Sequence, residues 1–211
     1  MAWTAPRTWV VNEVVTASIM NTHVRDNFDA LAGYGTSLPT GSNNLRYILV
    51  DSVSAPSYQW ELRYNGSASG SYKWEFLGGI PYMSSEADIS VEYGSYGVTG
   101  SPAAITVPRS GEYLVGVQGL GLIQNNAGQT AATYLGVRVN STDPSDLDCK
   151  AVYTWENQGN QWGFGDGGEM KLVKTLAASD TLRLAHRMTT ESDCGASWYN
   201  ARLFLYPLRI S

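Results

Sequence analysis

The segment 155–165 carries the residue types in this chain that best suit recognition of another molecule. It reads W-E-N-Q-G-N-Q-W-G-F-G, so aromatic rings and side-chain amides occur together in a stretch with several glycines. Aromatic faces pack on pyranose rings, amides bond to sugar hydroxyls, and binding residues concentrate on loops. The pattern predicts a ligand-binding loop, within or beside Gln158–Gly168, for a surface polysaccharide. Its residues are Trp155, Asn157, Asn160, Trp162 and Phe164. The alternative is that these aromatics cap the end of a barrel or contact a neighbouring subunit.

The other polar residues form no recognisable catalytic or metal-binding pattern. His23 and His186 have no Cys, Asp or Glu at ligand spacing. The cluster Asp143, Asp146 and Asp148 lacks the glycine and terminal glutamate of a calcium loop, which favours turn-forming aspartates.

Three carboxylates flank the glycine-rich loop and leave one catalytic alternative open. Glu156, Asp166 and Glu169 could supply the carboxylate pair of a glycosidase, but the sequence does not fix their separation. No phosphate-binding glycine motif and no nucleophile elbow occurs. We therefore predict a protein that is not an enzyme and needs no cofactor or metal.

Composition excludes two classes of partner. The 211 residues carry a net charge of -5, and their 14 Lys and Arg are spread along the chain, which excludes nucleic-acid binding. No apolar run resembles a signal peptide or a membrane span, so we expect no membrane insertion. Only 16% of residues are charged, which predicts that sister subunits cover part of the surface. Cys149 and Cys194 could pair, although free thiols are favoured in a reducing cytosol.

The N-terminal residues 1–33 have the pattern of an anchoring segment. Thr16 is a typical N-cap for a helix over 17–32 that ends before Gly33. Such a helix has one apolar stripe and is marginal alone, so it must dock on its own domain, on sister subunits or on another protein. The predicted anchoring residues are Trp3, Trp9, Met20, Val24, Phe28 and Leu31.

Residues 34–83 are predicted to form a linker, a strand over 46–51 and an aromatic β-hairpin. The hairpin strands cover 58–64 and 72–76, where aromatic and charged residues alternate around a glycine-rich loop. One face is an aromatic wall and the other a charged ladder. The wall is either buried packing or a platform for a ligand. Its residues are Tyr58, Trp60, Tyr64, Tyr72, Trp74 and Phe76.

Residues 84–211 alternate with the period of β-strands. A first strand is marked by Ile89, Val91 and Tyr93. Further strands are predicted near 103–108, 111–123, 131–140, 149–157, 169–175, 180–188 and 198–210, with turn signals between them. This spacing predicts an antiparallel β-sandwich.

Two motifs in this region resemble the C1q/TNF-like family of trimeric jelly rolls. One is P-x-S-G-x-Y-L, with Pro108, Ser110, Gly111, Tyr113 and Leu114. The other is L-x-x-x-D-x-L-x-L, with Leu176, Asp180, Leu182 and Leu184. The resemblance implies a jelly-roll sandwich that assembles as a homotrimer, and it implies no particular receptor.

The N-terminal segment resembles one that is common in tail-associated and fibre-like proteins of tailed bacteriophages. The residues that carry this resemblance are Val15, Thr16, Ala17, Met20, Asn21, Arg25, Asp26, Asn27 and Leu31. The later Y-K-W-E-F-L-G-G-I-P is similar to a phrase in phage proteins that leads into the same C-terminal domain. Together these features predict a virion protein, assembled in the host cytoplasm, that contacts other phage structural proteins. The predicted form is a trimeric tail fibre or tail-tip protein. The alternatives are a trimeric capsid decoration or head-fibre protein and a lectin-like binding module.

Overall fold

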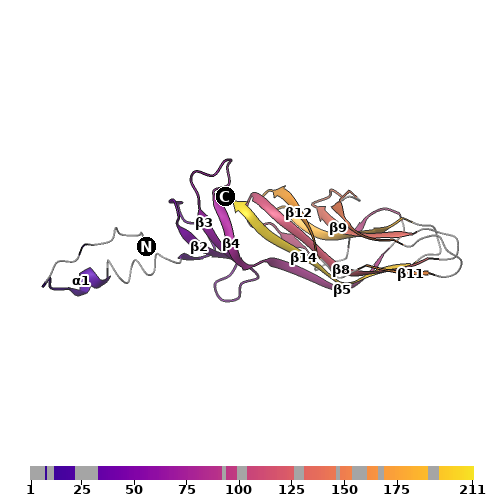
Figure 1. Cartoon of the computed structure of the whole chain (residues 1–211), viewed down its shortest axis with the longest axis horizontal. Coiled ribbons are helices and arrows are strands. Elements are labelled where there is room, and N and C mark those ends of the chain that lie inside the picture. Colours follow the sequence, from indigo (N-terminus) through magenta and orange to yellow (C-terminus); the bar gives the residue numbers. More distant parts are fainter. Residues whose placement is uncertain are drawn as a thin grey trace. The chain divides into compact units, whose positions relative to one another are not determined.

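A computed structural model describes residues 8, 12–21, 33–91, 94–98, 104–125, 131–145, 148–153, 161–165, 169–189 and 195–211. In these residues the chain forms fourteen strands and one short helix, so the predicted mainly β class is confirmed (Figure 1). The chain divides into an N-terminal unit, Met1–Ile80, and a C-terminal unit, Pro81–Ser211.

Within the N-terminal unit, four strands are joined in chain order. The strands β2, β3 and β4 pair antiparallel, and β1 pairs with β2 in parallel. The predicted hairpin is β3 and β4, with a β-bulge at which Leu77 is the additional residue. The sequence placed 34–45 in a linker, but its first residues belong to β1. The strands are β1 (Gly33–Gly35), β2 (Arg46–Val50), β3 (Gln59–Tyr64) and β4 (Trp74–Ile80).

The central residues of the aromatic wall are buried. Trp60 is 0% exposed, and Tyr58 and Trp74 are each 4% exposed. The Tyr58 and Trp60 rings stack with centroids 4.1 Å apart, and Tyr64 meets Trp74 edge-on at 5.3 Å. At these positions the packing interpretation is therefore correct and the ligand platform is not, because a ligand cannot reach a buried ring.

The opposite face of the hairpin carries the predicted charged ladder. Arg63 donates to the Glu75 carboxylate at 2.8 Å across the β3–β4 pair. Arg46 lies 3.5 Å from the Glu61 carboxylate across the β2–β3 pair. Opposite charges on directly paired or diagonal positions stabilise a sheet by about 0.2–1 kcal/mol each. The strict alternation thus divides β3 into one packed and one solvated side.

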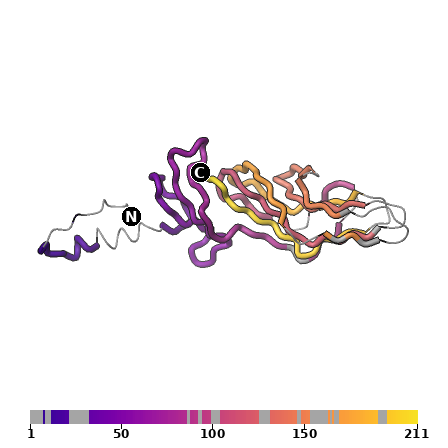
Figure 2. Tube along the Cα trace, in the orientation of Figure 1, coloured from indigo at the N-terminus to yellow at the C-terminus, as the bar shows by residue number. Residues whose placement is uncertain are grey.

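The C-terminal unit consists of two antiparallel sheets. In the first sheet β14 lies between β5 and β8, while β12 and β11 pair with successive parts of the other edge of β8. In the second sheet β9 lies between β10 and β13, and β6 and β7 pair with β13. Figure 2 shows the yellow trace of β14 running along this unit. The strands are β5 (Tyr82–Val91), β6 (Gly97–Val98), β7 (Ile105–Thr106), β8 (Gly111–Asn125), β9 (Ala132–Val139), β10 (Lys150–Tyr153), β11 (Gln161–Phe164), β12 (Glu169–Leu176), β13 (Thr181–Met188) and β14 (Gly195–Ile210).

The pairing of these strands defines a jelly roll. Leaving aside the short β6 and β11, eight strands follow one another from β5 to β14. The first pairs with the eighth, the second with the seventh, the third with the sixth and the fourth with the fifth. This is a long antiparallel ribbon folded over into two sheets, and the β14–β8 and β13–β9 pairs complete each sheet. The predicted jelly-roll topology is therefore present.

The core of this unit lies between the inward faces of the two sheets. Leu203 and Leu205 from the first sheet and Leu182 and Leu184 from the second are all 0% exposed. Alternate residues of β14 are buried, as the period of two requires, except where the register shifts between Tyr199 and Arg202 and between Pro207 and Arg209. Burying a leucine side chain stabilises the fold by about 1.5–3 kcal/mol.

Two turns that carry the family-like motifs meet at one end of this unit. The Val107 amide donates to the Asp180 carbonyl, and the Ser179 amide donates to the Val107 carbonyl, both at 2.8 Å. The Ser110 hydroxyl accepts from the Ala178 amide at 3.0 Å. The two turns that carry the motifs are therefore bonded to each other, through Ser110 of one motif and Asp180 of the other.

The end of β14 joins the same group of turns, which we call the turn junction (residues 107–111, 177–180 and 211). The Ser211 amide donates to the Ser110 carbonyl at 3.0 Å. The Tyr113 hydroxyl donates to the Arg109 carbonyl at 2.6 Å. A side chain at Gly111 would begin 2.3 Å from the Arg209 carbonyl oxygen, so only glycine permits this approach.

Some boundaries differ from those predicted. The first strand of the jelly roll begins at Tyr82, seven residues before Ile89, because the polar run Ser84, Ser85 and Glu86 interrupts the alternation of apolar and polar residues. The predicted glycine-rich loop 158–168 contains β11, which pairs with the outer end of β8. The Gly165 amide continues this pairing by donating to the Gly121 carbonyl at 2.9 Å. The predicted strand residue Tyr93 lies outside the described residues.

Replacing Gly111 tests the turn junction. We expect Gly111→Ala to lower the free energy of unfolding by about 1–3 kcal/mol, because the added methyl meets the Arg209 carbonyl and the Ile210 side chain. Urea unfolding at fixed protein concentration measures the change. The matched control is Gly195→Ala in β14, where a Cβ meets nothing within 4 Å, and it should stay within about 0.5 kcal/mol of the wild type. Equal effects of the two substitutions would contradict the close approach at the junction.

Asp51 makes the 51–57 loop sensitive to acid. The Ser57 amide donates to its carboxylate at 2.7 Å. Burial by itself raises the pKa of this carboxyl, but hydrogen bonds from Ser57 and from nearby backbone amides outweigh it, so the pKa is below the usual 3.8. The stabilisation is therefore present above pH 3.8 and is lost as the pH falls through the lower pKa of the folded state. We expect the Ser57 amide resonance to titrate with a midpoint below 3.8, and the titration to vanish in Asp51→Asn. A midpoint at or above 3.8 contradicts the assignment.

Candidate functional site

The sequence-predicted ligand loop lies largely outside the described residues. This applies to Trp155, Asn157 and Asn160. Trp162 and Phe164 lie in β11, opposite Gln124 and Leu122 of β8, and only their backbone is described. Two of the five predicted residues are thus on a paired strand, whereas the sequence pattern placed them in an open loop.

The predicted anchoring helix is described only at its start. The helix α1 (Ala17–Met20) begins with Thr16 as its N-cap, whose hydroxyl accepts from the Ile19 amide at 3.3 Å. Met20 is 45% exposed. The remaining anchoring residues lie outside the described residues, namely Trp3, Trp9, Val24, Phe28 and Leu31.

The acidic residues that suggested a calcium loop form ion pairs where they are described. Asp143 pairs with Arg138, and Asp148 lies 3.1 Å from the Lys174 amine. Such pairs support the interpretation of these carboxylates as structural. Among the described residues, no group of three or more His, Cys, Asp or Glu is placed to hold a metal ion. In the same part of the chain, no helix is long and apolar enough to cross a membrane.

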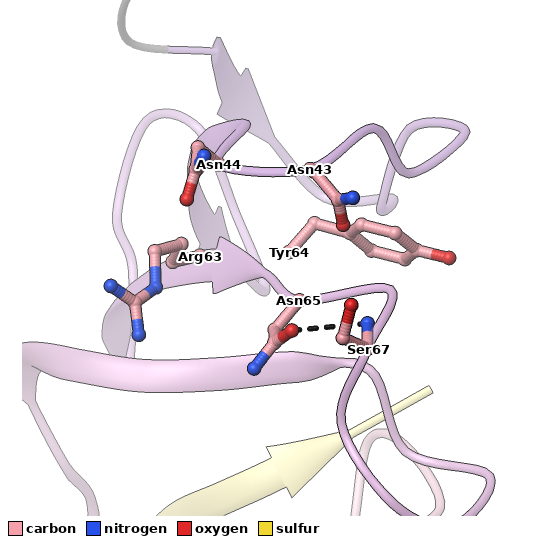
Figure 3. Close-up of a pocket in the computed structure, with 6 residues that line it drawn as sticks. All are labelled: Asn43, Asn44, Arg63, Tyr64, Asn65 and Ser67. Atoms are coloured by element: carbon pink, nitrogen blue, oxygen red, sulfur yellow. Dashed lines mark hydrogen bonds between the residues drawn. The ribbon is translucent and has the colours of Figure 1, made fainter.

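A polar pocket in the N-terminal unit is a candidate for binding a small molecule. Its volume is about 280 Å³. It lies between the turn that precedes β2 and the turn that follows β3, which the antiparallel β2–β3 pair brings together. In Figure 3, Asn43 and Asn44 lie on one side, Asn65 and Ser67 on the other, and Tyr64 of β3 between them. The lining residues are Asn43, Asn44, Arg63, Tyr64, Asn65 and Ser67.

Hydrogen bonds hold both walls of this pocket. The Gly66 amide donates to the Asn43 side-chain oxygen at 2.7 Å, which joins one wall to the other. The Ser67 amide donates to the Asn65 side-chain oxygen at 3.1 Å. On the first wall the Asn44 amide donates to the Tyr64 carbonyl at 3.0 Å. These bonds join the two turns to each other and to β3.

The outward face of the first sheet in the C-terminal unit is a second candidate, of a different kind. Phe204 of β14 lies beside Met83 of β5, and Tyr206 of β14 lies beside Leu114 of β8, which in turn is paired with Val173 of β12. Val173 is 65% exposed and Met83 is 48% exposed. We call these five residues the apolar face. A contiguous exposed apolar patch typically marks an interaction surface.

Charged residues border the apolar face. The Lys171 amine lies 5.5 Å from the centre of the Tyr206 ring, and it also pairs with the Glu169 carboxylate at 3.1 Å. Burial and the Glu169 carboxylate raise the pKa of Tyr206, so its hydroxyl stays protonated and able to donate near neutral pH. The Tyr206 and Phe204 rings are stacked, with centroids 6.2 Å apart. The face thus combines aromatic area with a polar rim.

Known proteins resemble this chain only weakly. No family model matches the chain, and no characterised sequence does. Among solved structures, the chain is similar to "Structure of Eiger TNF from S. frugiperda", with 16% identity over 61% of this chain and 93% of that one, at a TM-score of 0.35. It is also similar to "Structure of infectious bursal disease virus Gx strain", with 9% identity over 71% of this chain and 42% of that one, at a TM-score of 0.33. Because both TM-scores are below 0.5, the jelly-roll assignment rests on the strand pairing of the C-terminal unit itself.

Proposed function

We propose that this chain is a homotrimeric structural protein of a tailed-bacteriophage virion, attached to the particle by its N-terminal segment. In this proposal the protein acts through its surfaces, with no catalysis and no cofactor. The observation that carries the trimer is the apolar face of the C-terminal unit. The phage context is supported by the resemblance of the N-terminal segment to those of tail-associated proteins.

Burial of the apolar face supplies the driving force for assembly. Each apolar Å² removed from water contributes about 25 cal/mol, and obligate interfaces typically exceed roughly 2,000 Å² in total. Stacked rings beside exposed aliphatic side chains resemble the apolar centre of such an interface, and Lys171 and Glu169 supply its polar rim. In a closed threefold assembly the face of every copy is covered.

The N-terminal segment supports attachment to a larger particle. Thr16 caps the start of the helix as the sequence predicts, while Val15 and Met20 at this start are 47% and 45% exposed. A short helix with exposed apolar residues is marginal alone and gains stability by docking. We propose that this docking joins the trimer to the tail.

Introducing a charge on the apolar face tests the trimer. We expect the wild-type protein to have three times the chain mass of 22.9 kDa in light scattering after size-exclusion chromatography. Val173→Asp should shift it to the mass of a single chain, because assembly would bury an unpaired carboxylate. Val173 is 65% exposed, so the substitution should leave the fold of one copy intact.

The matched control for this experiment is Val53→Asp in the N-terminal unit. Val53 is 63% exposed, lies in the loop after β2, and is not one of the residues of the apolar face. It should keep the mass of the wild type. A wild-type protein that remains a single chain at micromolar concentration would overturn the proposal, and so would a Val173→Asp protein that remains trimeric.

Labelling of virions tests the placement. With a labelled antibody raised against the chain, electron microscopy of intact particles should show signal at the tail. Signal over the head would overturn the tail placement and favour a capsid decoration or head-fibre protein. Particles from which the gene for this chain is deleted are the control for nonspecific label.

A further inference from the structure

We propose that the polar pocket of the N-terminal unit binds one ring of a neutral saccharide. The site lies between the Asn43–Asn44 turn and the Asn65–Ser67 turn, and the sequence pattern did not point to it. The inference goes beyond the assembly role and does not depend on the trimer, because all six lining residues belong to one unit of one chain.

The lining chemistry matches a polyhydroxylated ligand. Three carboxamides and one serine hydroxyl converge on about 280 Å³, which is close to the lower limit of roughly 300 Å³ for ligand sites and suits a single sugar ring. The Asn44 carboxamide can donate and accept at once, so it can bond two neighbouring hydroxyls, whereas Asn65 already donates to Glu75 and accepts from Ser67. Among the described residues, no hydrogen bond engages the Asn44 side chain or the Asn43 amide nitrogen.

The charges around the pocket favour a neutral ligand. Arg63 donates to one oxygen of the Glu75 carboxylate and Asn65 donates to the other, each at 2.8 Å. The positive charge of Arg63 is thus balanced by Glu75, and Figure 3 shows its guanidinium pointing away from Tyr64. Both oxygens of Glu75 are also engaged, so it is poorly placed to bind a cation. With no free charge in the pocket, the ligand groups that its side chains suit best are uncharged hydroxyls.

The two turns of the pocket are held in place by their own hydrogen bonds, so a few weak contacts are enough to bind a ligand. Asn44 has a φ of +67°, a left-handed conformation typical of tight turns, and the Leu45 amide donates to the Ser42 carbonyl at 2.9 Å in the same turn. The Lys73 amine donates to the Ala68 carbonyl at 2.6 Å and closes the loop on the other side. Fixed turns lose little conformational freedom on binding.

The test uses saturation-transfer NMR with the full-length protein and the methyl glycosides of glucose, galactose, mannose, N-acetylglucosamine and N-acetylgalactosamine. We expect at least one to bind with a Kd of about 1–10 mM, as is usual for a small ligand with few contacts. The double variant Asn44→Gly, Ser67→Ala should weaken that binding by about tenfold, since each removed side chain contributes a hydrogen bond. Glycine at 44 keeps the positive φ, so the backbone of the turn is retained.

The matched control is Asn200→Gly in the C-terminal unit. Asn200 is also exposed and has a φ of +50°, so the same change is made at a residue that does not line the polar pocket, and the affinity should equal that of the wild type. If the double variant does not fold, the single variant Ser67→Ala replaces it in the test. This variant should weaken binding by about threefold to fivefold.

Three results would overturn the inference. They are the lack of saturation transfer from all five glycosides, unchanged affinity in the folded double or single variant, and tighter binding of methyl glucuronide or inorganic phosphate than of any neutral glycoside. Light scattering on the same samples reports the trimer separately, so failure of one proposal is distinguishable from failure of the other.

Discussion

The two sheets of the C-terminal unit are tied together at one end by turns that bond to each other. Val107, which follows β7, exchanges backbone hydrogen bonds with the turn between β12 and β13, and Ser110 bonds both to that turn and to the residue after β14. These turns connect strands that are far apart in sequence, so their bonds fix how the folded ribbon closes. The inward leucines can pack only when that closure is correct. The rest of the unit therefore depends on a small polar junction.

This dependence explains why part of the fold could be predicted from the sequence. The residues that make the junction, such as Ser110, Gly111 and Asp180, are of types that few other residues can replace in a tight turn, and they stand at fixed distances from alternating apolar positions. Strands with one buried and one solvated face, such as β13 and β14, show the alternation directly. The edge strand β5 was recognised only in its second half, because serine and acidic residues occupy much of its length.

The candidate site was not predictable by the same reasoning. The pocket joins Asn43 and Asn44 to Asn65 and Ser67, two turns that become neighbours only when β2 and β3 pair. Each turn alone looks like an ordinary surface loop. The strands over 46–51 and 58–64 were both expected, and pairing them as an antiparallel hairpin would have brought the two asparagine-rich ends together. The sequence pattern instead favoured the loop around 158–168 because of its aromatic residues, but Trp162 and Phe164 lie on a paired strand.

The length of β8 places its two ends far apart, so substitutions at one end have little effect on the other. Fifteen residues at about 3.3 Å each give a strand of roughly 50 Å, with Gly111 at the junction and Gln124 opposite Gly195 at the other extreme. Substitutions so far apart act additively on stability. Substitutions at the distal extreme can therefore accumulate without any compensating change at the closed end.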